Sequence, residues 1–222
     1  MKKRLGLFMA LAMAAVVIVV TGIILLGSGN KNDSTSNIGN GDTSGNSSQN
    51  GIKINLADNS NYFAIVDGKK YTVSNTIQNI LNDGYTVSES GTNLKQVLEA
   101  GEYSANTVNM RKGNSYDAYF AVTPINRTAK SLTLAECTLY EIHLNDTWYK
   151  NVSIVGGITF GNSIEEVEEV FGIPTTKEAN VLKPEEMTVA YYQGTNRVSG
   201  NFLFHFNSDG KLYSIIMTSN KN

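Results

Sequence analysis

The segment Gly157–Pro174 constrains the fold most, because it specifies a short helix together with both of its ends. Ser163 and Glu166 have the spacing of a capping box, in which each side chain binds a free amide of the first helical turn. Gly172 can adopt a positive φ, and Pro174 prevents continuation of the helix. The apolar residues at helical spacing are Ile164, Val167 and Phe171. The segment therefore predicts a helix that packs one face against other structure.

A hairpin near the C-terminus supplies a surface for this helix to cover. Strands are expected at 201–206 and 211–217, joined by the turn residues Asn207–Gly210. Because side chains alternate along a strand, one face is expected to form the core, with Phe202, Phe204, Phe206, Tyr213, Ile215 and Met217. The opposite face is expected to carry Leu203, His205, Leu212, Ser214 and Ile216. This second face is too apolar to be fully solvated, so the first half of the chain or a partner covers it, and a tandem architecture favours the first half.

The chain from residue 52 onward is expected to form two α+β units, 52–150 and 151–222. In the first unit, a strand at Tyr62–Val66 precedes a helix that starts near Ser74 and ends at Gly84. Leu94, Val97 and Leu98 are read as a further helical turn. Other strands are expected at 107–111, 118–123, 132–144 and 188–193. We therefore predict an α+β fold in which two small units of short helices pack on antiparallel sheets, with a tandem repeat left open.

The N-terminus has the pattern of a membrane anchor. An uncharged apolar run, Leu5–Leu26, follows Lys2, Lys3 and Arg4. As a helix with a rise of ~1.5 Å per residue it would be ~33 Å long, enough to cross a hydrocarbon core of ~30 Å. Positive charge before the run predicts a single-pass cell-membrane protein with its C-terminal domain extracellular. Residues 1–27 are thus predicted to be a transmembrane anchor, and a cleaved signal segment that releases a secreted protein is the alternative.

Residues 28–51 are rich in Gly, Ser and Asn and are predicted to be a flexible linker between the anchor and the folded part. The tract Ser28–Asn50 would span an r.m.s. distance of roughly 26 Å. From Ile52 onward the chain has 14 Lys/Arg and 18 Asp/Glu, for a net charge of −4. Because it has no basic cluster to bind phosphates, nucleic acid is not expected as a partner.

No pattern predicts a catalytic, cofactor-binding or metal site, so we expect a protein without enzymatic activity or cofactor. His143 and His205 are the only histidines, and neither has further ligands at the spacing that zinc requires. Cys137 is the only cysteine and is expected to be a small buried residue. Cys137 and His143 would lie ~20 Å apart along one strand, too far for a nucleophile and its base. Contact between Cys137 and His205 across the fold stays open.

The part from about Gly156 to Met217 reads as a helix with Gly-x-Pro at its end, a Tyr-Tyr strand, Phe-x-Phe-x-Phe, and Asp-Gly-Lys-Leu. The residues of this series are Gly161, Ser163, Val167, Phe171, Gly172, Pro174, Tyr191, Tyr192, Phe202, Phe204, Gly210, Leu212 and Ile215. The series resembles the repeat of the SmpA/OmlA (BamE) outer-membrane assembly lipoproteins, and its layout is similar to that of the β-lactamase inhibitory protein (BLIP) family. The whole chain looks like exported proteins of unknown function from low-GC Gram-positive bacteria.

This resemblance implies a BamE/BLIP-like protein-binding scaffold with no catalytic residues. The lipobox cysteine of the BamE group is absent here and the chain is longer, so a role in outer-membrane assembly is not carried over. We expect a binding or assembly module that contacts an extracytoplasmic protein. The alternatives are a secreted-enzyme inhibitor of the β-lactamase-inhibitor type and a cell-envelope hydrolase with carboxylates assembled in space. Because large rings dominate interfaces, the partner-binding candidates combine the hairpin face with nearby aromatic residues: Leu203, His205, Leu212, Ile216, Tyr192, Trp148 and Tyr149.

Overall fold

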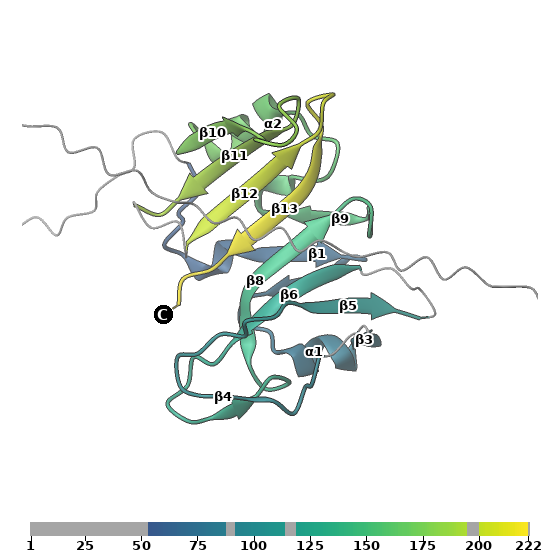
Figure 1. Ribbon diagram of the computed structural model, residues 1–222, viewed down its shortest axis with the longest axis vertical. Helices are drawn as coiled ribbons and strands as arrows, with labels where there is room; N and C mark the ends of the chain where they lie inside the picture. Colours follow the sequence, from purple (N-terminus) through teal and green to yellow (C-terminus); the bar gives the residue numbers. More distant parts are fainter. Residues whose placement is uncertain (1–52, 88–91, 114–118, 195–199, 222) are drawn as a thin grey trace, which may run out of the picture. The chain divides into compact units, whose positions relative to one another are not determined.

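An eight-stranded antiparallel sheet is the main element of the computed structural model, which describes residues 53–87, 92–113, 119–194 and 200–221. Its strand order is β10-β11-β12-β13-β8-β6-β5-β3 (Figure 1). Along the chain these strands are β3 (Tyr85–Val87), β5 (Val108–Lys112), β6 (Phe120–Ile125), β8 (Thr138–Asn145), β10 (Thr176–Ala179), β11 (Met187–Tyr192), β12 (Asn201–Phe206) and β13 (Leu212–Thr218).

One face of this sheet is covered by two short helices and a second, smaller sheet. The smaller sheet has the order β2-β1-β9. The covering elements are β1 (Phe63–Val66), β2 (Lys69–Thr72), α1 (Ile77–Asn82), β9 (Val152–Ile154) and α2 (Ile164–Phe171). All of them contribute buried residues to a single core with the large sheet. The remaining elements are η1 (Asn59–Asn61), β4 (Val97–Leu98), β7 (Leu132–Thr133) and η2 (Val155–Gly157).

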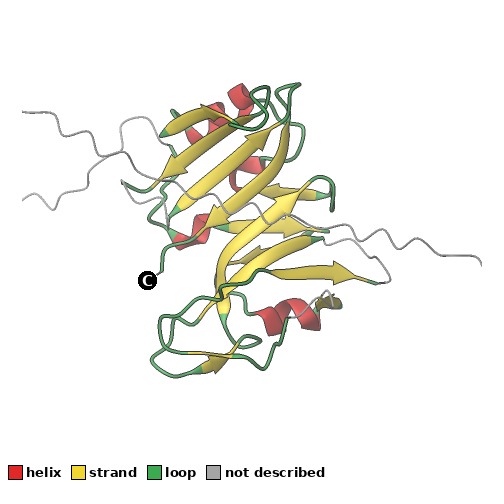
Figure 2. Ribbon diagram, in the orientation of Figure 1, coloured by secondary structure: helices red, strands yellow, loops and turns green. Residues whose placement is uncertain are grey.

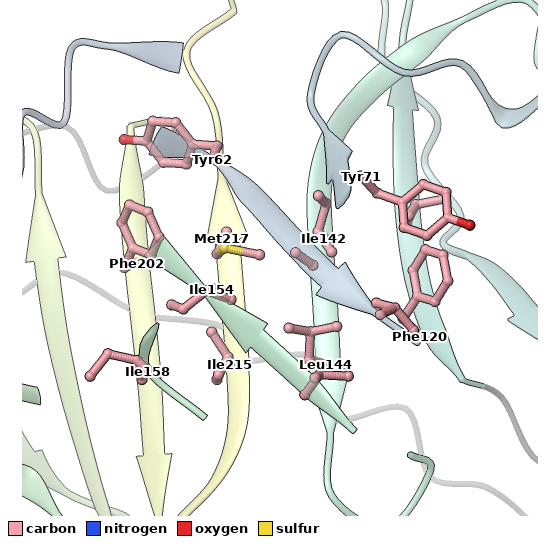
Figure 3. Packing of buried hydrophobic residues seen from close by; sticks show 14 of the residues in the cluster. Tyr62, Tyr71, Phe120, Ile142, Leu144, Ile154, Ile158, Phe202, Ile215 and Met217 are labelled. Atoms are coloured by element: carbon pink, nitrogen blue, oxygen red, sulfur yellow. The ribbon is translucent and has the colours of Figure 1, made fainter. Parts of the chain in front are cut away.

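Aromatic side chains join the small sheet and the residue before it to both halves of the large sheet. Tyr62 precedes β1 and stacks on Phe202 with ring centroids 4.8 Å apart, and Tyr71 of β2 stacks on Phe120 at 5.4 Å. Figure 3 shows these two pairs on either side of the aliphatic residues between them. The core is therefore continuous from the C-terminal strands to the N-terminal ones.

The helix predicted from the sequence is confirmed as α2. The Ser163 hydroxyl accepts a hydrogen bond from the Glu166 amide, and the Glu166 carboxylate accepts one from the Ser163 amide at 2.6 Å. The helix ends at Gly172, whose φ of 86° and ψ of −157° lie in a region that favours glycine. Phe171 is fully buried beneath the helix, between the rings of Tyr191, Phe202 and Phe204.

The α+β expectation of two small helix-on-sheet units is wrong, because the described chain is rich in strands and its helices are few and short (Figure 2). β13 pairs with β8 from Ser214↔Asn145 to Thr218↔Glu141, so strands from both halves of the chain form one sheet. The helical turn expected at 94–98 is also wrong, since Val97 and Leu98 form β4 and pair with β7. The strands of the first half thus lie beside those of the second half in the same sheet. They do not pack on the second face of the hairpin.

The expected faces of the hairpin are wrong at two positions, Leu212 and Tyr213. The pairing register shifts between His205 and Phe206, so that Phe206 lies opposite Leu212 while His205 lies opposite Ser214. Such a bulge adds one residue to a strand and reverses the side-chain alternation on one side of it. Leu212 is consequently 1% exposed in the core, whereas Tyr213 turns to the opposite face.

The predicted anchor, residues 1–27, and the predicted linker, residues 28–51, lie outside the described residues. Within the ranges that the structure describes, no helix combines the length and apolarity needed to cross a membrane.

Candidate functional site

The face of the large sheet opposite the core, here called the open face, is the candidate site. In Figure 1, α2 and β1 lie behind the strands of the large sheet. No helix or strand among the described residues covers the other side of those strands. The registers of β11, β12, β13 and β8 place the following residues on the open face: Thr188, Ala190, Tyr192, Asn201, Leu203, His205, Ser214, Ile216, Thr218, Glu141 and His143.

The middle of the open face is apolar and is bordered by an aromatic ring. Leu203 and Ile216 are paired across β12 and β13, and both are only partly buried. Ile216 lies opposite His143 on β8, and the Trp148 ring meets the His143 ring edge-on with centroids 5.0 Å apart. A contiguous group of aliphatic and aromatic side chains therefore reaches solvent at the centre of the sheet.

Two imidazoles flank this apolar group, and burial keeps both of them neutral near neutral pH. His143 Nε2 lies 3.1 Å from Ser214 Oγ, and His205 Nδ1 lies 3.0 Å from Thr188 Oγ1. Burial, together with the nearby His205, lowers the pKa of His143 to about 4. Burial also lowers the pKa of His205 below its usual value. These positions therefore offer polar contacts without adding positive charge to the face.

Glu141 places a carboxylate on the open face. The hydroxyl of Thr218 donates to Glu141 Oε2 at 3.3 Å, and the hydroxyl of Thr123 donates to Oε1 at 3.5 Å. Among the described residues, the salt bridges involve other carboxylates, so no cation pairs with Glu141. Burial raises the pKa of Glu141, because the two long hydrogen bonds offset only part of the lost hydration.

Replacing Glu141 with Gln is expected to stabilise the fold near pH 7 by on the order of 1 kcal/mol, or roughly 2–4 °C in Tm, because a desolvated charge is removed. The raised pKa means that the folded state binds the proton more tightly than the unfolded state. Stability from this group is therefore present at low pH and is lost as pH rises through the folded pKa. The gain from Glu141→Gln should shrink as pH falls toward the unfolded pKa of a glutamate. Thermal melts of Glu141→Gln and of the unsubstituted protein between pH 7 and the unfolded pKa of a glutamate check this prediction. A gain in stability that does not change with pH would contradict it.

The structure brings five of the seven predicted partner-binding residues together. Leu203, His205 and Ile216 lie on the open face, Tyr192 lies there at 9% exposure, and the Trp148 ring packs edge-on against His143 of that face. The other two lie elsewhere. Leu212 is in the core, and the Tyr149 ring stacks on Tyr119 while its hydroxyl donates to Asp67.

Sequence reasoning missed Glu141 and His143 as members of this site. Their shared parity along the strand was a signal that they lie on one face. The pairing of β8 with β13, which brings them beside Ile216 and Thr218, was not predicted.

Ser214 and His143 are hydrogen-bonded as a nucleophile and its base would be, yet their surroundings do not favour nucleophilic catalysis. Ser214 is 4% exposed and lies within a strand whose register is paired on both sides. Cys137 is buried with Leu98 and Leu134, and burial raises the pKa of its thiol. Across the described ranges, no three His, Cys, Asp or Glu side chains are placed to hold a metal ion.

The open face thus has an apolar centre, neutral imidazoles and a carboxylate, Glu141, that pairs with no cation among the residues that the structure describes. Comparison of the chain with protein-family models, with curated proteins and with solved structures found no match, so the interpretation of this face depends on its own geometry.

Proposed function

We propose that this chain is a membrane-tethered extracytoplasmic binding or assembly module whose open face binds a protein partner without catalysis. The observation that supports the proposal most is the partly buried pair Leu203 and Ile216 at the centre of a sheet face that no described layer covers. Apolar side chains in the middle of a face, with aromatic and polar groups around them, match the composition of protein interfaces.

The dimensions of the face suit a protein better than a small ligand. The residues assigned to the open face lie on four strands, which together are roughly 14 Å wide at ~4.8 Å spacing and about 20 Å long over six residues. A protein partner commonly buries ~800 Å² on each side, so such a partner would cover these strands and reach beyond them. Small ligands instead prefer concave pockets. Among the described residues, a cavity of about 370 Å³ lies away from this face. It is lined by Thr92, Asn93, Gln96, Ser104, Asn106, Thr107 and Leu134.

Site-specific photo-crosslinking of the full chain in its host membrane tests this proposal. A photoreactive phenylalanine analogue at Leu203 or Ile216 should give a discrete crosslinked product. The matched control is the same residue at Glu165, which is exposed on α2 and belongs to the covering layer. Crosslinking from the open face but not from α2 supports the proposal, and equal yields from both would contradict it.

A variant with an introduced charge adds a second readout. Leu203→Arg places a charge at the centre of the open face and should abolish the crosslink from Ile216. Glu165→Arg should leave the crosslink unchanged. Both variants should keep the native melting midpoint, because both side chains reach solvent.

An inhibitor of an exported enzyme is the second candidate function. An antiparallel sheet face that carries Tyr213 and is bordered by Trp148 would suit contact with a rigid loop from an enzyme. Saturable inhibition of a class A β-lactamase by the purified chain, lost in Leu203→Arg and kept in Glu165→Arg, would favour this function over an assembly role.

A further inference from the structure

We propose that the loop at 180–186, between β10 and β11, docks on the lipid bilayer and inserts Val181 and Leu182 into its interface. The proposal rests on the tethering proposed above, because it needs the folded part to be held near a membrane. It adds a second membrane contact, made by described residues of the folded part itself.

The loop carries the two most exposed large apolar side chains of the described chain. Val181 is 93% exposed and Leu182 is 81% exposed. Single exposed apolar residues are ordinary on protein surfaces. Here two adjacent aliphatic side chains protrude from one loop and contribute almost nothing to the core.

Hydrogen bonds hold this loop in a defined shape, so it does not fold its apolar residues inward. Asn180 Oδ1 accepts from the Leu182 amide at 3.0 Å, and the Asn180 amide donates to the Glu186 carbonyl at 2.9 Å. The Tyr213 hydroxyl donates to the Glu186 carboxylate at 3.1 Å, which ties the loop to β13. Lys183 Nζ lies 2.6 Å from Glu186 Oε1, so these two charges neutralise each other next to the apolar pair.

The bilayer is the apolar phase that the sequence places within reach of the loop. The described chain begins at Lys53, whose amide donates to the Phe171 carbonyl at the end of α2. From Ile173, near that point, to Val181 is ~26 Å along an extended chain at ~3.3 Å per residue. The residues ahead of Lys53 are expected to span a similar r.m.s. distance, roughly 26 Å.

Two aliphatic side chains bind a bilayer only weakly by themselves, so the tether is essential. A short linker makes the second contact intramolecular, with an effective concentration in the millimolar range. Both signs of charge occur near the loop at this end of the sheet: Lys150, Lys183, Lys211, Asp146, Glu185, Glu186 and Asp209. Docking is therefore expected to depend little on anionic lipid.

This docking would leave the open face accessible. The loop lies where β11 begins, and the turn between β12 and β13 lies at the same end of the sheet. With that end toward the bilayer, the strands point at the membrane and the open face points sideways, toward partners beside the protein.

An environment-sensitive fluorophore on the full chain tests the contact. Cys137→Ala removes the native thiol, and Leu182→Cys allows NBD to be attached at the tip. The labelled chain is reconstituted into phosphatidylcholine vesicles, with a second set that contains phosphatidylglycerol. We expect a several-fold rise in NBD emission with a blue shift, and quenching by nitroxide-labelled lipids, in both sets.

The controls separate this proposal from the tethering on which it rests. NBD at Val97→Cys, an exposed aliphatic position on β4, should show neither the rise nor the quenching. Val181→Asp, in the chain labelled at 182, should reduce both. A chain that floats with the vesicles but shows no change at 182 overturns the docking and leaves the tether standing. A chain that does not float overturns the tether and the docking together, and an equal rise at 97 and 182 overturns the docking.

Discussion

Replacing Phe171 with Ala is expected to destabilise the fold by about 3–5 kcal/mol, the cost of removing a buried aromatic ring and leaving a cavity. Phe171 is fully buried, and its ring centroid lies 5.0 Å from Phe202, 5.0 Å from Phe204 and 5.1 Å from Tyr191. Three aromatic neighbours would lose their contact at once. Equilibrium unfolding in urea measures the loss, with a midpoint that falls while the slope stays constant.

Ile173→Ala is the matched control, because it removes an apolar side chain that is 69% exposed two residues further along. We expect a change within about 0.5 kcal/mol for that variant. Equal effects of the two substitutions would contradict the packing of α2 on the large sheet. Phe171→Leu should fall between them, since it keeps part of the buried volume.

The same helix shows why some of the fold could be predicted from the sequence. Its two ends are set by contacts within three or four residues, such as Ser163 with Glu166 and the Gly172 amide with the Glu168 carbonyl. Local contacts of this kind leave a readable spacing in the sequence. The alternation that buries Phe202, Phe204 and Phe206 is local in the same sense.

The pairing of β8 with β13 could not be predicted from the sequence, and the predicted fold class was therefore wrong. Sheet pairing uses backbone groups that every residue carries, so Ser214↔Asn145 and Thr218↔Glu141 leave no distinctive spacing. A β-strand of two residues, such as Val97–Leu98, is also too short to show an alternation, and its apolar spacing therefore predicts a helical turn instead.

The candidate site was predictable in part for the same reason. Leu203, His205 and Ile216 follow from alternation along two strands joined by a turn. The bulge between His205 and Phe206 then moved Leu212 into the core and Tyr213 out of it, and nothing in the hairpin pattern marks its position. Glu141 and His143 come from a strand some 70 residues earlier, so their membership depends on the pairing of β8 with β13.

Replacing Arg127 with Met is expected to destabilise the fold by about 2–4 kcal/mol, because hydrogen bonds from a charged donor are lost and their acceptors stay in place. The guanidinium donates to Thr138 Oγ1 at 2.8 Å, the Leu139 carbonyl at 2.9 Å, Ser219 Oγ at 2.7 Å and the Asn220 carbonyl at 3.0 Å. It therefore joins the start of β8 to the residues that follow β13. Burial lowers the pKa of Arg127, whose side chain still remains charged near neutral pH.

The position of these hydrogen bonds predicts which part of the fold loses stability first in Arg127→Met. The Ser219 amide donates to the Tyr140 carbonyl, and the Asn220 amide to Asn59 Oδ1. In Arg127→Met, hydrogen exchange of both amides should become faster than in the unsubstituted protein, because this end of the sheet opens locally. The amides at the centre of β12 should be affected less. Arg127→Lys should recover only part of the stability, because an ammonium cannot reproduce the planar fork of donors. Lys130→Met, an exposed cation three residues away, is the control. Matching melts for Arg127→Met and Lys130→Met would show that Arg127 does not hold the end of β13, and hence the Thr218 edge of the open face, in place.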